Sequence, residues 1–221
     1  MRQTFHDRAA AAADAISEED ALKYLEEMRE SWEGLSKNLS RSTVFYLLTA
    51  GLFELLIGSG QDLKASIAGF QFTNSETLQK ALPVVSGYLF YDVVVLVWRW
   101  FDFEDVFRVF WVKFRRDLYV RDMEVLLKPS SGIMGIGHRH PGEGPLPGFA
   151  RAAQAVFTIL FLLVLPIAFF AHSAFLLIQK FGGGDPLVVV SISLSGLFTM
   201  YGLVYTFLIY KEDKFVLESE R

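Results

Sequence analysis

The sequence predicts an all-α, polytopic membrane protein with four transmembrane helices and additional cytoplasmic amphipathic helices. Of its 221 residues, 52% are hydrophobic, and most of the charged side chains lie in residues 1–42 and 99–151. Four apolar runs between and after these two blocks carry almost no charge. Segregation of charge from long apolar runs is typical of a chain that crosses a bilayer several times, so the four runs are interpreted as membrane spans.

Residues 1–41 are predicted to form a cytoplasmic segment with one amphipathic helix. Residues 1–16 are rich in alanine and are expected to fray, whereas Ser17 and the three acids after it are typical of a helix start. Apolar side chains then recur at alternating spacings of four and three, as in a heptad seam: Ala21, Leu25, Met28, Trp32, Leu35 and Leu39. Two interpretations remain open. The helix packs on its own protein or on the membrane surface, or it oligomerises through Leu25, Met28, Trp32, Leu35 and Leu39.

Residues 42–101 are predicted to hold the first two spans, over 42–58 and 82–100, joined by an external loop at 59–81. Within this loop, residues 66–72 are apolar enough to touch the membrane or to form a short strand. Residues 152–210 are predicted to hold the third span, over 152–178, and the fourth, over 187–210. Pro166 interrupts the hydrogen-bond ladder of the third span and predicts a kink there. A charged cytoplasmic tail follows at 211–221.

Residues 102–151 are predicted to form a cytoplasmic amphipathic helix over 103–127, followed by a linker rich in glycine and proline. One face of this helix is aromatic and aliphatic, and the other carries basic residues. The helix is expected either to lie in the membrane interface against anionic headgroups or to pack against the acidic helix of residues 17–40. The candidate contacts with the membrane surface or with a partner are Phe107, Trp111, Arg108, Lys113, Arg115 and Arg116.

The distribution of lysine and arginine predicts the orientation. Six basic residues precede the first span, and nine lie in the connection after the second when Arg99 at its end is included. The first loop holds two, and the glycine-rich turn after the third span holds one. Because basic connections favour the cytoplasmic side, both termini are predicted to be cytoplasmic.

Two acids inside the predicted spans are the main candidates for chemistry. A charged side chain at bilayer depth costs roughly 2.5–3.5 kcal/mol on insertion, so Glu54 and Asp92 are functional candidates. With about 1.5 Å of rise per residue, Glu54 is expected roughly 18 Å, and Asp92 roughly 10–13 Å, from the inner end of its span. Carboxylates at similar depth on neighbouring helices could share a proton or hold a cation. The candidate ion pathway or buried polar cluster comprises Glu54, Asp92, Tyr88, His172 and Arg99. The alternative is that these acids only hold the bundle together.

Small residues in the spans are interpreted mainly as helix contacts. Gly51 and Gly58 flank the face of Glu54 in the first span. The fourth span carries a stripe of small and hydroxyl side chains at helical spacing, namely Ser191, Ser195, Thr199, Gly202 and Thr206. Such stripes usually mark close packing between helices in lipid.

Several classes of function lack support in the sequence. The chain has no cysteine, which excludes disulfides and thiolate chemistry, and its net charge of −4 disfavours nucleic acid as a partner. His138 and His140, with Glu143 nearby, are too few ligands for a convincing metal site. No motif indicates an enzyme, and no cofactor or metal is expected.

The sequence therefore leads to two expectations of different class. The first is a homo-oligomeric channel or pore-forming protein whose intramembrane carboxylates set a preference for cations or protons. The alternative is a scaffold or anchor subunit that transports nothing and recruits a cytosolic partner through its cytoplasmic helices. A third interpretation, a lipid-handling protein, rests only on the aromatic and basic helix. The expected partners are the lipid bilayer with its anionic headgroups, further copies of the chain and, in the alternative, a cytosolic protein.

Overall fold

The structure is a computed structural model that describes residues 5–58, 65–67, 70–72, 75–119, 156–157 and 159–219. Among these, side chains are described for residues 8–58, 76–117, 156–157 and 159–207. The chain divides into two compact units. The first contains Met1–Ser40 and Leu96–Val156, and the second contains Arg41–Val95 and Phe157–Arg221. The Gly/Pro linker and His138 to His140 lie outside the described residues.

Part of the alanine-rich start of the chain forms helix α1, Phe5–Ala15, so the prediction of fraying is wrong for these residues. Alanine is the best helix former, and Ala9 and Ala13, one turn apart, are both buried in the first unit. The Lys113 ammonium donates to the carbonyl of Ala13 at 2.7 Å and also pairs with the Asp14 carboxylate. The bond from Lys113 gives a partner to one of the last backbone carbonyls of α1, which have no partner within the helix.

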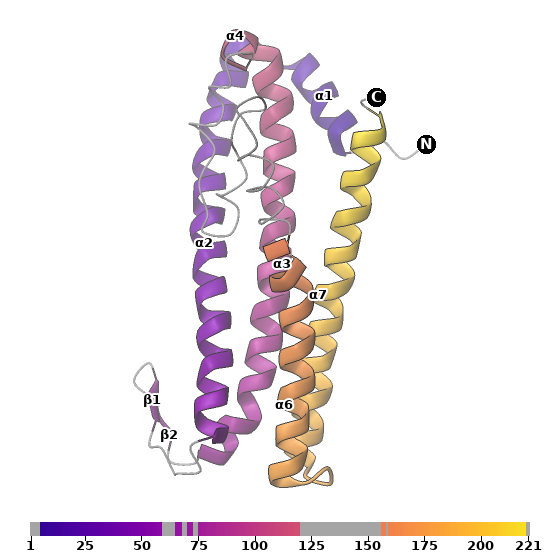
Figure 1. Cartoon of the computed structure of the whole chain (residues 1–221). Coiled ribbons are helices and arrows are strands. Elements are labelled where there is room, and N and C mark those ends of the chain that lie inside the picture. Colours follow the sequence, from indigo (N-terminus) through magenta and orange to yellow (C-terminus); the bar gives the residue numbers. More distant parts are fainter. Residues whose placement is uncertain are drawn as a thin grey trace, which may run out of the picture. The chain divides into compact units, whose positions relative to one another are not determined.

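The predicted N-terminal helix and the first predicted span are one helix, α2, Glu18–Gly58 (Figure 1). Ser17 begins it as predicted: its hydroxyl oxygen accepts a bond from the Asp20 N–H at 3.3 Å, and its carbonyl accepts one from Ala21 at 2.9 Å. The 41 residues of α2 correspond to a length of about 62 Å. The sequence changes from charged to apolar near residue 42, but it contains no proline there. A change in hydropathy alone does not end a helix, so α2 continues.

A small hairpin follows α2. Strand β1, Ala65–Ile67, pairs antiparallel with β2, Phe70–Phe72, in a register that places Ser66 opposite Gln71. Of the two alternatives for residues 66–72, the short strand is therefore confirmed. This hairpin is the one departure from the all-α prediction among the residues that the structure describes.

Helix α3, Ser75–Phe114, begins seven residues before the predicted second span and includes Pro83. It continues through the predicted boundary at residue 100 into the amphipathic stretch and ends at Phe114. A four-residue helix, α4, Arg116–Tyr119, follows after Arg115. The predicted amphipathic helix over 103–127 is thus the end of α3 together with α4, and residues 120–127 lie outside the described part of the chain.

The third predicted span contains a π-helical turn, η2, Leu160–Val164, directly before α6, Leu165–Phe181. Pro166 is the second residue of α6 and has no N–H to donate. In the preceding turn, the N–H of Leu165 bonds to the carbonyl of Leu160, five residues back. The hydrogen-bond ladder is thus irregular directly before Pro166, as a π-turn, and the kink itself stays a prediction. Gly182, with φ of 86°, ends α6, and α7, Pro186–Ser219, begins after a short turn.

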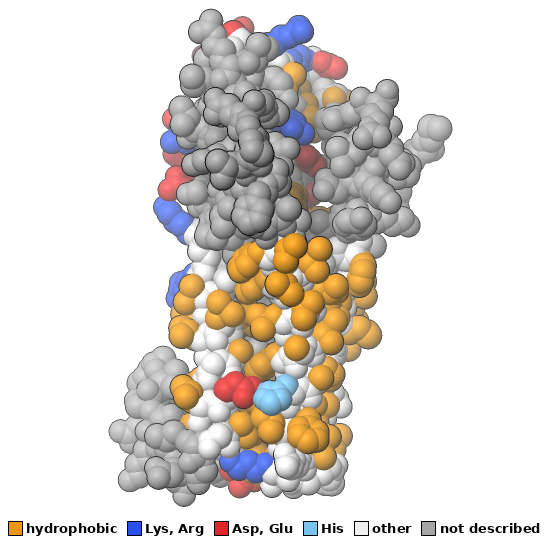
Figure 2. All heavy atoms as spheres, viewed as in Figure 1, with side chains coloured by type: hydrophobic (Ala, Val, Ile, Leu, Met, Phe, Trp, Pro, Cys, Tyr) orange, Lys and Arg blue, Asp and Glu red, His pale blue; other side chains and the backbone are white. Residues whose placement is uncertain are grey.

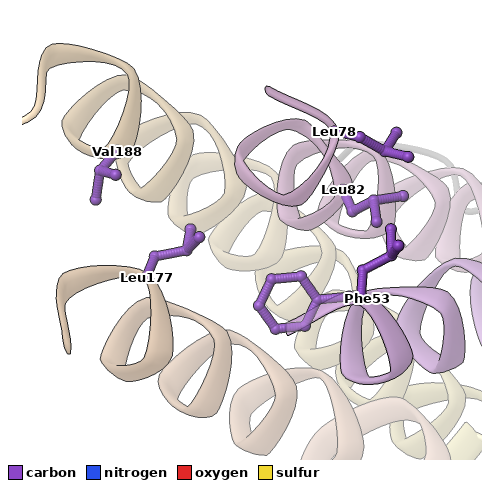
Figure 3. Close-up of a cluster of buried hydrophobic side chains, with 6 residues drawn as sticks. Phe53, Leu78, Leu82, Leu177 and Val188 are labelled. Atoms are coloured by element: carbon purple, nitrogen blue, oxygen red, sulfur yellow. The ribbon is translucent and has the colours of Figure 1, made fainter. Parts of the chain in front are cut away.

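Four helices are long and apolar enough to cross a membrane, as predicted. They lie within Glu18–Gly58, Glu76–Phe114, Leu160–Phe181 and Pro186–Phe207. In the second unit all four contribute to one core, which includes Phe53 of α2, Leu82 of α3, Leu177 of α6 and Val188 of α7 (Figure 3). This core holds the end of α2, the start of α3, the end of α6 and the start of α7 together.

The stripe of small residues on α7 packs against α3 in the second unit, which confirms its interpretation as a helix contact. Ser191 and Ser195 are buried, and their hydroxyls donate to the carbonyls of Lys80 and Pro83. A Cβ added at Gly202 would lie 2.5 Å from Cε1 of Phe90. The side chains on this face of α7 are therefore small because α3 approaches closely.

The heptad seam of α2 is buried inside the first unit. Leu25, Met28, Trp32, Leu35 and Leu39 are each at most 8% exposed. The ring of Trp32 packs against Trp100 and Phe107 of α3, with centroids 5.2 and 5.5 Å apart. The oligomerisation interpretation of this seam is therefore corrected. Intramolecular packing already covers the side chains that a second copy would have to contact.

The aromatic face of the amphipathic stretch is also buried. Phe107 and Trp111 stack at 5.4 Å and are 1% and 7% exposed, so the expectation that they contact the membrane surface is corrected. They pack in the same unit as residues 17–40, as the second alternative predicts. Of the basic candidates in this stretch, Arg108, Lys113 and Arg116 are exposed and Arg115 is half-buried.

Candidate functional site

An ionisable pair, Glu54 of α2 and His172 of α6, lies on the apolar surface of the second unit. Oε2 of Glu54 is 3.2 Å from Nε2 of His172, and the two side chains are 45% and 53% exposed. Figure 2 shows an acidic side chain beside a histidine in an otherwise largely hydrophobic area of the viewed face. The sequence predicted both residues as candidates, but it did not pair them with each other.

Packing beneath the pair explains its position. Phe53 precedes Glu54 and is fully buried, and its ring contacts Phe169 edge-on with centroids 5.7 Å apart. His172 lies one helical turn after Phe169, so it shares that side of α6. The Phe53–Phe169 contact therefore brings α2 and α6 together at a register that places the carboxylate next to the imidazole.

The pair forms part of the lining of an open hollow of about 450 Å³ between α2 and α6. The hollow is lined by Glu54, Ile57, Gly58, His172, Leu176, Gln179 and Lys180. It therefore combines one carboxylate, one imidazole, one amide and one ammonium with apolar walls. Its surroundings are strongly apolar, since Leu55 and Phe175 are 68% and 63% exposed.

Asp92 has a different partner. The hydroxyl of Ser42 donates to Oδ2 of Asp92 at 2.8 Å, in a half-buried position between α2 and α3. A second bond between these helices runs from the side-chain amide of Gln79 to the carbonyl of Leu56 at 3.1 Å. The two bonds together show that the helices are antiparallel, and the first places Asp92 level with Ser42. Glu54, twelve residues further along α2, is then about 18 Å away along the axis.

The prediction that Glu54 and Asp92 share one depth is therefore wrong. That prediction assumed that Ser42 and Trp100, the inner ends of the first two predicted spans, lie at the same level. In the first unit, however, the indole N–H of Trp100 donates to the hydroxyl of Ser36 at 3.2 Å, which places Trp100 level with Ser36. The apolar runs of the two helices are offset, and only the packing register reveals that offset.

The remaining members of the predicted polar cluster are separate from the pair. Tyr88 is half exposed in the second unit, and its ring contacts Phe198 of α7 edge-on at 5.6 Å. Arg99 is exposed in the first unit. Of the five predicted residues, the structure therefore brings together only Glu54 and His172. Among the residues it describes, no three histidine or acidic side chains converge as metal ligands would.

An ionic cluster around Lys80 in the second unit was not predicted from the sequence. The ammonium of Lys80 is 2.6 Å from Oδ2 of Asp185, also pairs with Glu76, and lies 4.4 Å from the ring centroid of Phe181. The Lys80 side chain is only 6% exposed. The spacing of four between Glu76 and Lys80 was the available signal, but these residues had been assigned to a loop rather than to the start of α3.

Asp185 joins this cluster to the start of α7. Its Oδ1 accepts bonds from the N–H groups of Leu187 at 2.8 Å and Val188 at 3.3 Å, which is the geometry of a helix N-cap. The hydrogen bond from Lys80 is the main reason that the pKa of Asp185 lies below its ordinary value. Burial is the next largest effect and raises this pKa, and the N–H groups of Val188 and Leu187 lower it again.

Replacing Asp185 with Asn is expected to lower the melting temperature of the detergent-solubilised protein in a pH-dependent way. A lowered pKa in the folded state stabilises the fold fully above about pH 4, the ordinary range of an aspartate. That stabilisation is lost as the pH falls through the lowered pKa. Melting curves of the parent and Asp185→Asn should therefore differ at neutral pH and converge in acid. A difference that is constant across the pH range would contradict this account.

No protein-family model matches the chain, and no curated protein or solved structure shows significant similarity to it.

Proposed function

We propose that this chain is a multi-pass membrane protein with both termini in the cytoplasm, and that it forms homo-oligomers that conduct cations or protons past the Glu54–His172 pair. The observation that carries this proposal is the half-exposed pair on the apolar surface of the second unit. Ionisable groups at membrane depth are costly when they face lipid, and they usually face a protein interface or water instead. A second copy around an aqueous path would provide that environment.

The glycines of α2 support an interface at this face. Gly51 and Gly58 lie at helical spacings of three and four from Glu54 and are exposed, and a Cβ at either would meet nothing within 4 Å. By contrast, Gly87 and Gly196 are closely packed against Ser195 and Phe170 of the same unit. Small residues allow close approach of helices in lipid. The open glycines on either side of Glu54 therefore suit a helix of another copy.

The proposal is tested by ion flux into liposomes that contain the purified full-length protein. The parent should pass cations or protons, and Glu54→Gln should reduce flux to the level of empty liposomes, because the amide carries no charge and exchanges no proton. The matched control is Glu30→Gln, the same change at an exposed position of α2 in the first unit, which should leave flux unchanged. Asp92→Asn tells whether the path extends to the second carboxylate. A parent that passes no ion under any gradient would refute the proposal.

Self-assembly is tested separately by cross-linking and native mass measurement. Gly51→Leu should weaken the oligomer while the helical content stays unchanged, since the added side chain meets no atom of its own chain. Gly34→Leu is the matched control, because Gly34 is likewise open but lies in the first unit. A parent that is monomeric in bilayers would contradict the assembly.

The scaffold alternative has lost much of its basis. It relied on the heptad seam and on the aromatic face of the amphipathic stretch, and both are buried within the first unit. What remains for a cytosolic partner or for anionic headgroups is a set of exposed basic side chains that includes Arg108 and Arg116. No described contact favours that role over the conduction proposed above.

A further inference from the structure

We infer that the ion carried past Glu54 and His172 is the proton, and that Lys180 excludes metal cations from the same hollow. This inference rests on the proposed function and specifies its substrate. It uses the one hollow described above, which Glu54 lines from α2 and His172 and Lys180 line from α6. These three are the titratable side chains in its lining.

The geometry of the pair suits proton exchange. The 3.2 Å between Oε2 of Glu54 and Nε2 of His172 is within the distance over which hydrogen-bonded groups transfer a proton. A protonated imidazole gives up the proton on Nε2 to the carboxylate, which breaks an N–H bond and forms an O–H bond. The products are a neutral imidazole and a carboxylic acid, and the acid then releases the proton to water. Because the pair is half exposed, both groups are accessible from the hollow.

The donor set is poor for a metal cation. Calcium takes six to eight oxygen ligands, and potassium filters are built from rings of carbonyl oxygens. The polar lining contributed by one copy is a single carboxylate and the amide of Gln179, beside an imidazole and an ammonium. Imidazole is also the side chain best suited to gain and lose protons near neutral pH.

The positive charge of Lys180 offsets the negative charge of Glu54 that would attract a metal cation to the hollow. Its ammonium lies 5.7 Å from the ring centroid of Phe181 and forms no salt bridge with the residues that the structure describes. Each copy therefore brings one negative and one positive side chain to the hollow. Assembly around an axis multiplies both equally, so a ring of Glu54 carboxylates comes with an equal number of Lys180 ammonium groups. A hydrated metal cation meets no net negative field there, whereas a proton binds directly to one side chain.

The test is the reversal potential of the full-length protein in planar bilayers with independent proton and potassium gradients. In the parent, the reversal potential should move by about 59 mV for each tenfold change in proton concentration. It should not respond to potassium. His172→Gln should abolish the proton current. Lys180→Gln should make the reversal potential respond to potassium, whereas Lys23→Gln, the same change at an exposed site of the first unit, should not.

The outcomes separate the inference from the function on which it rests. A parent whose reversal potential follows potassium overturns the inference and leaves conduction standing. The same holds if the reversal potential of Lys180→Gln does not respond to potassium, because the charge of Lys180 would then not be what excludes metal cations. A parent with no current of any kind overturns both. Circular dichroism of each variant must match the parent, and Lys180→Met provides a second neutral replacement if the glutamine variant fails to fold.

Discussion

Replacing Trp32 with alanine is expected to lower the free energy of unfolding by about 3–5 kcal/mol, the usual cost of truncating a large buried aromatic side chain. Trp32 is fully buried in the first unit, and its ring packs between those of Trp100 and Phe107 on α3. The cavity left by the indole would remove both contacts. Chemical denaturation followed by near-ultraviolet circular dichroism, or hydrogen exchange of the α2 and α3 segments in this unit, would measure the loss.

Two comparisons make this prediction specific. Trp32→Phe should cost less than alanine, because it keeps an aromatic ring and removes an indole N–H that has no hydrogen-bond partner among the described residues. Tyr24→Ala, on the same helix and 42% exposed, should also cost less although its ring lies 5.1 Å from that of Phe110. If Trp32→Ala left stability intact but broke an oligomer, the seam would be intermolecular after all.

Replacing Gly202 with alanine is expected to destabilise the second unit by about 1–3 kcal/mol, the usual range for an overpacked contact. The new Cβ would lie 2.5 Å from Cε1 and 2.9 Å from Cδ1 of Phe90. That ring cannot simply move away, because Phe90 is 1% exposed and packs near Tyr46, with centroids 6.1 Å apart. Either α3 and α7 must separate or the Phe90 ring must change its orientation. Thermal unfolding in detergent would report the loss.

A double-mutant cycle tests whether Phe90 is the cause. Phe90→Leu removes the ring atoms that the new methyl group would meet, so Gly202→Ala should cost less in that background. Gly34→Ala is the matched control. Gly34 lies in the interior of α2, where a Cβ meets nothing within 4 Å, and alanine should gain up to about 1 kcal/mol from helix propensity. Equal costs for Gly202→Ala with and without Phe90 would show that the contact is not responsible.

The helices were predictable from the sequence more reliably than their ends. Apolar runs of sufficient length predicted four helices that can cross a membrane, and the structure contains them. Ser17 marked the start of α2, because an N-cap is a local signal that depends on neighbouring residues alone. The boundaries at residues 42 and 100 were wrong as helix ends, since each lies inside one of the long helices α2 and α3. Hydropathy reports a change of surroundings, and the backbone hydrogen bonds continue through such a change.

The candidate site shows where sequence reasoning stops. The composition of the apolar runs determined that Glu54, Asp92 and His172 are the ionisable residues to consider, because charge is rare in such runs. Which of them meet was decided by packing. The contact between Phe53 and Phe169 places Glu54 beside His172, and the register of α2 against α3 places Asp92 beside Ser42. Helical periodicity assigns a side chain to a face, but it does not specify which neighbour that face meets or at what height.

The same distinction separates the seam from the open glycines. The sequence alone determined that α2 carries an apolar heptad stripe near its start and small residues around Glu54. Only the tertiary structure decided that Trp100 and Phe107 pack against Trp32 of the stripe. It also decided that a Cβ at Gly51 or Gly58 would have no neighbour within 4 Å. The physical reason is that apolar and small side chains specify that something packs closely against them. The identity of that neighbour depends on contacts between residues far apart in the sequence.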